Sequence, residues 1–163
     1  MTTPIADPLP PIANMRLFVI PLLTAAIAGT IGCASAKPAT AASPVLPEFV
    51  VPNRGNSPFS GVVRVGNLLF VSGQLGTDSL GKGIGAETAS AMNRISQLLK
   101  QAGSSLDRVA KCTVMLSDMS QWAAMNEAYN KFFPQRRPAR SSFGATALAQ
   151  GGHVEIECIA TVD

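Results

Sequence analysis

Histidine, cysteine and clustered positive charge are all scarce in this sequence of 163 residues. It has one histidine, His153, and three cysteines that lie far apart in the chain. This spacing excludes the ligand pattern of an ordinary zinc site and the cysteine density of a disulfide framework. The one adjacent basic pair, Arg136 and Arg137, is too small to follow a phosphate backbone. We therefore expect neither a metal site nor a nucleic-acid partner.

Hydrophobic residues make up 47% of the chain, and those in excess of a usual soluble protein lie in its first third. One positive charge at Arg16, a roughly 16-residue apolar run over residues 17–32 and an Ala34-Ser35-Ala36 site are typical of a bacterial secretory signal. The run is shorter than the about 20 residues that a membrane span needs. We predict that residues 1–36 are a targeting segment and that the protein is exported to the periplasm. The alternative is a cytoplasmic protein whose N-terminus does not act as a signal.

Two features of this segment leave alternatives open. Thr30-Ile31-Gly32-Cys33 resembles a lipobox, so lipidation of Cys33, and hence a lipid anchor, is the alternative to cleavage after Ala36. Asp7 and four prolines precede the positive charge and fit poorly in a signal, so we interpret Met15 as the true initiator. Residues 37–52 are rich in Ala, Pro, Ser and Thr without periodicity, which predicts a linker.

From residue 53 onward, the pattern predicts a sheet with two helices. The runs 62–65 and 68–72, joined by Gly66-Asn67, predict a β-hairpin, and Gly73-Gln74 ends its second strand. Apolar residues at helical spacing predict an amphipathic helix over residues 86–102, and Asp118 begins a second helix that Pro134 stops. That second helix is expected to bury Trp122, Met125, Tyr129 and Phe132. Residues 109–116, 141–145 and 154–162 are predicted to be strands. Residues 53–163 thus form one α+β domain whose helices cover one face of the sheet.

The last predicted strand alternates strictly between two faces. One face is apolar and includes Cys158, which, like Cys112 on its own strand, we interpret as a small hydrophobic residue. The other face carries two carboxylates, Glu155 and Glu157, beside Ile159. A sheet face that no helix covers and that is partly apolar usually finds a partner. We therefore expect a closed oligomer with sites between subunits.

Several segments resemble the RidA family, also called YjgF or L-PSP. They are Ser57-Pro58-Phe59-Ser60, Val65–Gln74, Ala102–Asp107, Pro138-Ala139-Arg140-Ser141 and Val154–Glu157. The resemblance implies a chorismate-mutase-like fold and a homotrimer whose sheets line a central barrel, with active sites between subunits. It also implies hydrolysis of reactive 2-imino acids and enamines, such as 2-aminoacrylate and 2-iminobutanoate, to 2-oxo acids and ammonia, without a cofactor.

The resemblance assigns roles to individual residues. Arg140 matches the arginine that clamps the substrate carboxylate, and Glu155 matches the glutamate that orients the attacking water. Ser72, Gly73 and Asn126 match positions that line the cleft. Phe59 stands where the family often has a tyrosine, and Ser142 stands where many members have a cysteine. Gly144 replaces a frequent acidic residue.

Two other functions remain open at this point. A binding module would keep the carboxylate clamp and lack the hydrolysis. An endoribonuclease activity is also attached to the family, but the sequence offers no histidine pair, aromatic platform or basic groove for RNA.

Overall fold

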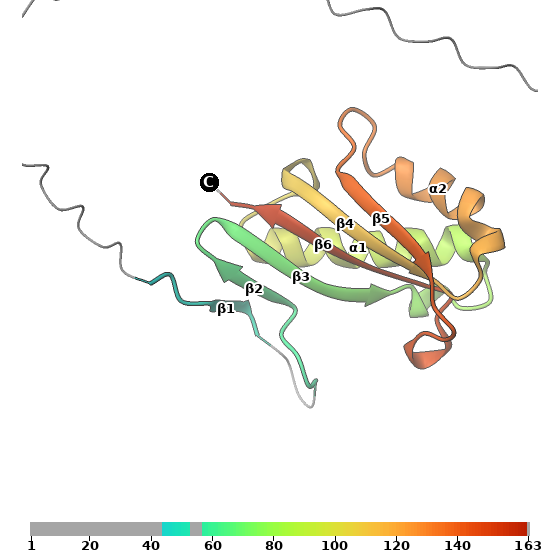
Figure 1. Cartoon of the computed structure of the whole chain (residues 1–163), viewed down its shortest axis with the longest axis horizontal. Coiled ribbons are helices and arrows are strands. Elements are labelled where there is room, and N and C mark those ends of the chain that lie inside the picture. The colour runs from blue at the N-terminus through green and yellow to red at the C-terminus, as the bar shows by residue number, and fades with distance from the viewer. Residues whose placement is uncertain (1–43, 53–56, 163) are drawn as a thin grey trace, which may run out of the picture. The chain divides into compact units, whose positions relative to one another are not determined.

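The structure is a computed structural model that describes residues 44–52 and 57–162 (Figure 1). The predicted targeting segment, the lipobox cysteine Cys33 and the proposed start at Met15 lie outside these residues. The helices and strands, in chain order, are β1 (Glu48–Val51), β2 (Val62–Val65), β3 (Leu68–Leu75), α1 (Ile84–Gln101), β4 (Val109–Leu116), α2 (Trp122–Asn130), β5 (Ala139–Gly144) and β6 (Val154–Thr161).

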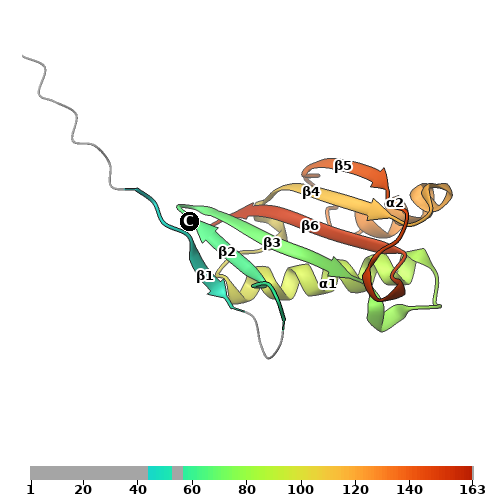
Figure 2. The ribbon, with the colours of Figure 1, turned by 60° about the horizontal axis from the view of Figure 1, so that its bottom comes forward.

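The strands form one mixed sheet in the order β1-β2-β3-β6-β4-β5. Only the β4–β5 pair is parallel, because α2 lies in the connection between these two strands. Both helices lie against the same face of the sheet, as Figure 2 shows. No helix of the described part covers the second face, which we call the open face. The predicted α+β arrangement, with two helices on one side of the sheet, is confirmed.

The hairpin at Gly66-Asn67 is also confirmed, but the strand that follows is longer than predicted. Gly66 has a φ of 61°, a left-handed conformation that glycine adopts without steric cost. β3 continues beyond Ser72 to Leu75, because the pairing register with β6 shifts between Val71 and Gln74. The sequence rule that glycine ends a strand was wrong here, since a bulge absorbs Gly73 within the strand.

Three further predictions were wrong in detail. The last residues of the predicted linker form strand β1, which pairs with β2 through Glu48 opposite Arg64. Trp122 is 44% exposed, although its helical spacing predicted burial. Phe133 is buried in place of the predicted Phe132, because α2 ends at Asn130 and the periodicity of the helix is lost beyond that residue.

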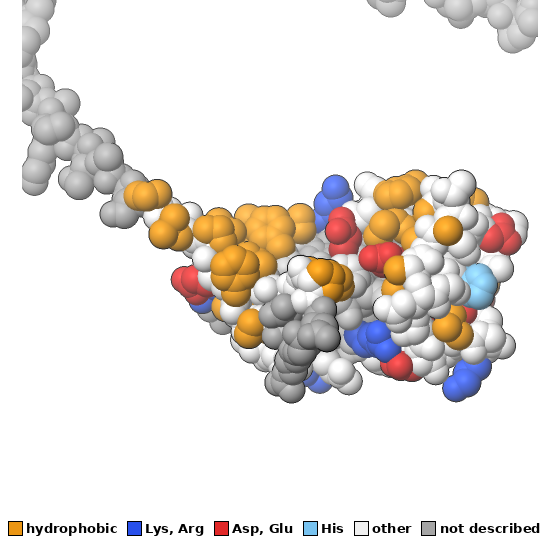
Figure 3. Space-filling view, turned by 90° about the horizontal axis from the view of Figure 1, so that it is seen from below, with side chains coloured by type: hydrophobic (Ala, Val, Ile, Leu, Met, Phe, Trp, Pro, Cys, Tyr) orange, Lys and Arg blue, Asp and Glu red, His pale blue; other side chains and the backbone are white. Residues whose placement is uncertain are grey.

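Large hydrophobic side chains are exposed at the β1 end of the domain. They include Leu46 just before β1, Phe49 in β1, and Leu68 and Phe70 on β3. Figure 3 shows hydrophobic side chains gathered next to the start of the described chain. Phe49 is 66% exposed, which is unusual for a phenylalanine unless another surface covers it.

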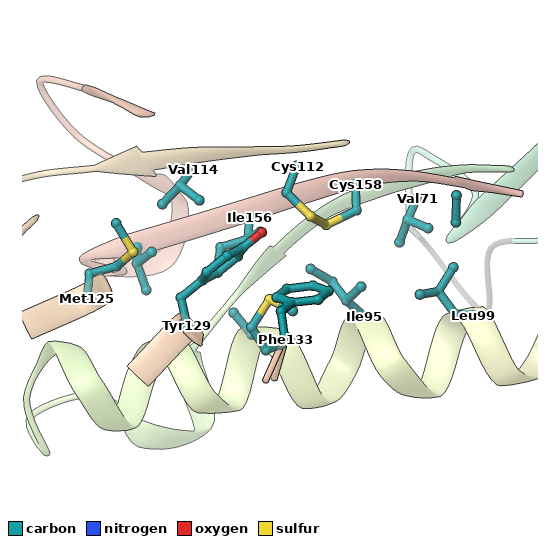
Figure 4. Close-up of a cluster of buried hydrophobic side chains, with 14 of the residues drawn as sticks. Val71, Ile95, Leu99, Cys112, Val114, Met125, Tyr129, Phe133, Ile156 and Cys158 are labelled. Carbon is teal, nitrogen blue, oxygen red and sulfur yellow. A yellow bond between two sulfur atoms is a disulfide. The ribbon is translucent and has the colours of Figure 1, made fainter. Parts of the chain in front are cut away.

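The core lies between the helices and the sheet (Figure 4). Helix α1 contributes Ile95 and Leu99, and the sheet contributes Leu69 and Ile156. Each of these four side chains is fully buried. Alternation in β6 therefore has the predicted sense, with Ile156 inside and Glu155 on the open face.

Cys112 and Cys158 form a disulfide between β4 and β6, which corrects their interpretation as small hydrophobic residues. The two residues are directly opposite each other in the antiparallel pair, with a Cα–Cα distance of 4.1 Å. They are 46 residues apart in sequence, and only the strand register brings them together. Both are buried in the core beside Phe133 and Ile95 (Figure 4).

We expect reduction of this disulfide to destabilise the domain. A cross-link that closes a loop of this length restricts the unfolded chain, and its loss lowers the free energy of unfolding by about 2–4 kcal/mol. Denaturant unfolding of the wild type with and without reductant measures the difference. The double variant Cys112→Ala/Cys158→Ala is the control, because its midpoint should not respond to reductant. A wild-type midpoint that reductant leaves unchanged would contradict the disulfide.

Within the part of the chain that the structure describes, neither helix has the length and apolar character required to span a bilayer.

Candidate functional site

Arg140 lies on β5, the strand at one edge of the sheet. Its pairing partner in β4 is Cys112, a core residue, so Arg140 projects toward the face that carries the helices. There its Nη2 group donates a hydrogen bond to Oδ1 of Asn126 in α2. The sequence placed Asn126 in the cleft as a substrate ligand, and the structure shows that it also holds the guanidinium.

The ring of Tyr129, one helical turn after Asn126, packs against the guanidinium of Arg140. The Arg140 Cζ atom lies 4.8 Å from the centre of the Tyr129 ring, a cation–π contact. Burial raises the pKa of Tyr129 to about 12, and the nearby Arg140 charge opposes this rise only in part. The phenol therefore stays neutral, and the guanidinium rests on an uncharged ring. Sequence reasoning treated Tyr129 as a core residue only.

A pocket of about 320 Å³ opens beside the guanidinium. Its lining consists of Asn126, Tyr129, Asn130, Arg137, Pro138 and Arg140. Among residues 44–52 and 57–162, no carboxylate forms an ion pair with Arg140. The guanidinium is thus held by one hydrogen bond and one ring contact, while its charge has no counterion in the described chain. This arrangement suits the binding of an external carboxylate in a bidentate pair.

Ser142 lies on the same side of β5 as Arg140, opposite Val114 of β4. Its hydroxyl is buried and has no hydrogen-bond partner within the described residues. The hydroxyl of Tyr129 is also buried and has no hydrogen-bond partner within the described residues. Unpaired buried hydroxyls are uncommon in folded proteins, so both residues indicate polar positions rather than ordinary core packing.

Glu155 lies on β6, between Leu75 of β3 and Met115 of β4. Its carboxylate rests over Gly73, where the bulge in β3 brings the backbone close. A Cβ added to Gly73 would overlap Oε1 of Glu155 and lie 3.0 Å from its Cδ atom. Gly73 is therefore required for the position of the Glu155 carboxylate, which is a steric role.

The structure does not bring Arg140 and Glu155 together within one chain. Val154 and Ile156, the neighbours of Glu155, point into the core, so Glu155 points to the open face. Arg140 points to the helix face, where it meets α2. The two predicted catalytic groups consequently lie on opposite sides of the sheet, and a single copy of this chain cannot direct both at one substrate.

Phe59 lies in the chain before β2, and Ser72 lies in β3 next to Gly73. Phe59 is 57% exposed and lines a separate pocket of about 350 Å³ with Gln74 and Leu98. The Ser72 hydroxyl donates a 2.6 Å hydrogen bond to the carbonyl of Ser60, next to Phe59. Ser72 thus anchors the segment that presents the aromatic ring. Neither residue lines the pocket at Arg140 in the same chain.

The only histidine of the sequence binds a buried carboxylate that sequence reasoning missed. Glu87 of α1 is 1% exposed. Its Oε2 atom accepts a hydrogen bond from the backbone N–H of His153 at 3.0 Å, and its Oε1 atom lies 2.8 Å from Nδ1 of the His153 ring. The position of Glu87 within the apolar stripe of the helix was the available signal. This pair attaches α1 to the start of β6, two residues before Glu155.

Comparison with known proteins agrees with this architecture. The family described as Endoribonuclease L-PSP matches residues 53–162. The chain belongs to the L-PSP family. The family match covers all of the residues assigned above to the candidate site.

Individual members of the L-PSP family are similar over this same domain. A 2-iminobutanoate/2-iminopropanoate deaminase from Capra hircus is 38% identical over 108 residues, which is 63% of this chain and 79% of the goat protein. The Reactive Intermediate Deaminase A, chloroplastic, of Arabidopsis thaliana is 34% identical over 110 residues, which is 64% of this chain and 59% of the plant protein. The crystal structure of RidA from the Antarctic bacterium Psychrobacter sp. has a TM-score of 0.62 and 33% identity, and the match covers 74% of this chain and 99% of that one. The domain therefore has the chorismate-mutase-like RidA fold that the sequence predicted.

Proposed function

We propose that this protein hydrolyses reactive 2-imino acids and their enamine forms, such as 2-aminoacrylate and 2-iminobutanoate, to 2-oxo acids and ammonia. Water adds to the imine carbon, a carbon–oxygen bond forms, and the carbon–nitrogen bond of the resulting carbinolamine then breaks. One water is consumed and one ammonia leaves, so the reaction is balanced without a redox partner or cofactor. The names of the goat and Arabidopsis relatives support this activity.

The observation that carries the proposal is the preorganised guanidinium of Arg140. Asn126 and Tyr129 fix it at the wall of a pocket, and no carboxylate of the described chain neutralises it. A substrate carboxylate that pairs with this guanidinium places the adjacent imine carbon at a defined position. Ser142, two residues along the same side of β5, then contacts the same substrate group through its hydroxyl or its backbone N–H.

Glu155 is the general base of this proposal. A carboxylate beside a bound water accepts a proton as the water attacks, and it returns this proton to the leaving nitrogen. The absence of a side chain at Gly73 leaves room for the Glu155 carboxylate. Phe59 supplies an aromatic wall without the hydroxyl that a tyrosine would offer.

We further propose that the protein forms a homotrimer in which each site is shared between two subunits. Arg140 lies at the β5 edge on one face, and Glu155 lies on the opposite face, so only a second copy can complete the site. The open face carries a shallow pocket of about 140 Å³ lined by Phe70, Ile159 and Glu157, among others. Burial of this face and of the exposed Phe49 in an assembly provides the driving force for association.

Export to an oxidising compartment is also part of the proposal. The features of residues 1–36 favour a signal segment, with lipidation of Cys33 or cleavage after Ala36 as its two outcomes. The buried Cys112–Cys158 disulfide adds independent support, because disulfides persist in the periplasm and are rare in the cytosol.

The experiment that tests the activity is imine hydrolysis by the purified protein. An amino-acid oxidase generates 2-iminobutanoate in the presence of semicarbazide, which traps the imine, and the protein should accelerate formation of the free 2-oxo acid. A carboxylate-binding module would bind 2-oxobutanoate without accelerating its formation. Absence of acceleration would contradict the proposed function. Cleavage of RNA that survives both rigorous purification and the Arg140→Ala substitution would favour an endoribonuclease instead.

A further inference from the structure

The pocket beside Arg140 contains a second guanidinium that the proposed chemistry does not use. Arg137 lines this pocket together with Arg140, and the remaining polar side chains of the lining are the neutral Asn126, Asn130 and Tyr129. No acidic residue belongs to the lining. The pocket of one chain thus carries two formal positive charges and offers two carboxamides and a phenol ring.

Arg137 is available to a ligand. Its side chain is exposed, and within residues 44–52 and 57–162 it takes part in no ion pair. Pro138 separates it from β5 and restricts the backbone on both sides of the proline. Three residues of extended chain span at most about 10 Å, so the two long side chains can contact opposite ends of one small molecule.

We propose that Arg137 binds a second carboxylate, so that the preferred substrates are dicarboxylic 2-imino acids, the imines of acidic amino acids. This inference rests on the proposed function and names its substrate class. Arg140 binds the carboxylate next to the imine carbon, and Arg137 binds the carboxylate at the end of the substrate side chain. The two asparagine carboxamides donate to the carboxylate oxygens that the guanidinium groups leave free.

The size and charge of the pocket support this choice. A volume of about 320 Å³ is at the lower end of small-molecule sites and accommodates a four- or five-carbon diacid. A monocarboxylic imine would leave the Arg137 charge unpaired in the pocket, whereas a diacid pairs both guanidinium groups. Like charges on the two arginines also repel each other in the empty pocket, and a dianion removes this repulsion.

The test compares two imines that differ in the second carboxylate, 2-iminoglutarate and 2-iminobutanoate, each generated by an amino-acid oxidase from its amino acid. We expect the wild type to have a kcat/KM about tenfold higher for 2-iminoglutarate, the gain of one charge-assisted contact. Arg137→Gln should remove this preference, so that the ratio of the two kcat/KM values falls to about one. Arg137→Lys should retain part of the preference, because it keeps the charge.

Arg136→Gln is the matched control, since it removes the same charge from the adjacent residue, which does not line the pocket. It should leave the ratio of the two kcat/KM values as in the wild type. A wild type without the preference, or an Arg137→Gln variant that keeps it, would overturn the inference while hydrolysis of 2-iminobutanoate still upheld the proposed function.

Calorimetric binding of the two products separates the inference from the catalytic proposal. 2-Oxoglutarate should bind the wild type about tenfold more tightly than 2-oxobutanoate, and Arg137→Gln should abolish the difference. If the protein hydrolysed neither imine, the proposed function would fail, and this difference in binding alone would uphold the diacid site. Equal binding of both products would overturn it.

Discussion

Replacement of Arg140 by alanine is expected to lower kcat/KM for 2-iminobutanoate by at least about 10²-fold. The guanidinium of Arg140 fixes the substrate carboxylate, and without it the imine carbon has no defined position relative to the attacking water. Asn126 and Tyr129 cannot substitute for Arg140, because neither carries a positive charge. Arg140→Lys should recover only part of the activity, since an ammonium group keeps the charge and loses the bidentate geometry.

The kinetics must be read beside a measure of folding, because Arg140 also contacts Tyr129. Loss of this cation–π contact costs about 0.5–1 kcal/mol, which leaves the domain folded at room temperature. Arg64→Ala is the control for the change in net charge, since Arg64 lies on β2 and its side chain donates a hydrogen bond to the carbonyl of Gly66. An Arg140→Ala protein with wild-type kcat/KM would refute the carboxylate clamp.

Mixing two inactive variants is expected to restore activity, because each site is proposed to take its residues from two chains. Glu155→Gln keeps the shape of the side chain over Gly73 and removes the base, so it should lower kcat by about 10²–10⁴-fold. An Arg140→Ala chain still supplies Glu155, and a Glu155→Gln chain still supplies Arg140. In a closed ring assembled from equal amounts of both, about a quarter of the interfaces receive both intact residues.

The experiment requires that the variants be unfolded together and refolded, so that subunits mix. Activity should rise to about a quarter of the wild-type value, and each variant refolded alone should remain inactive. As a control, the wild type is refolded with the double variant Arg140→Ala/Glu155→Gln. In these mixed oligomers, only the interfaces between two wild-type chains should be active. Failure of the two single variants to complement each other, despite formation of mixed oligomers, would rule out a site shared between subunits.

Local patterns predicted the elements of this fold well, and they failed where contacts between distant residues decide the structure. The strict alternation of β6 predicted which of its residues are buried, and Gly66-Asn67 predicted the hairpin, since both depend on neighbours in the chain. Strand β1 was missed because its run of four residues is short and lies between Pro47 and Pro52, although Phe49, Val50 and Val51 favour strands. The helical period placed Trp122 in the core, but Trp122 is the first residue of α2 and is exposed, and no local signal records this.

The site shows the same division. Motif resemblance identified Arg140, Asn126 and Glu155 as individual residues, but it could not show that Tyr129 supports the guanidinium or that Gly73 makes room for the carboxylate. Those roles depend on the packing of α2 under β5 and on a bulge in β3. Arg137 was considered only as half of a basic pair, and its position in the pocket emerged from the path of the chain around Pro138.

The sequence by itself determined the α+β class, the inward and outward sides of β6 and the identity of the candidate clamp and base, because side-chain periodicity and motif residues are properties of short segments. Only the tertiary structure decided that Cys112 bonds to Cys158 and that Arg140 and Glu155 lie on opposite faces of one sheet. Both outcomes follow from strand order and register. These are set by the packing of the whole core, so no single segment of the sequence encodes them.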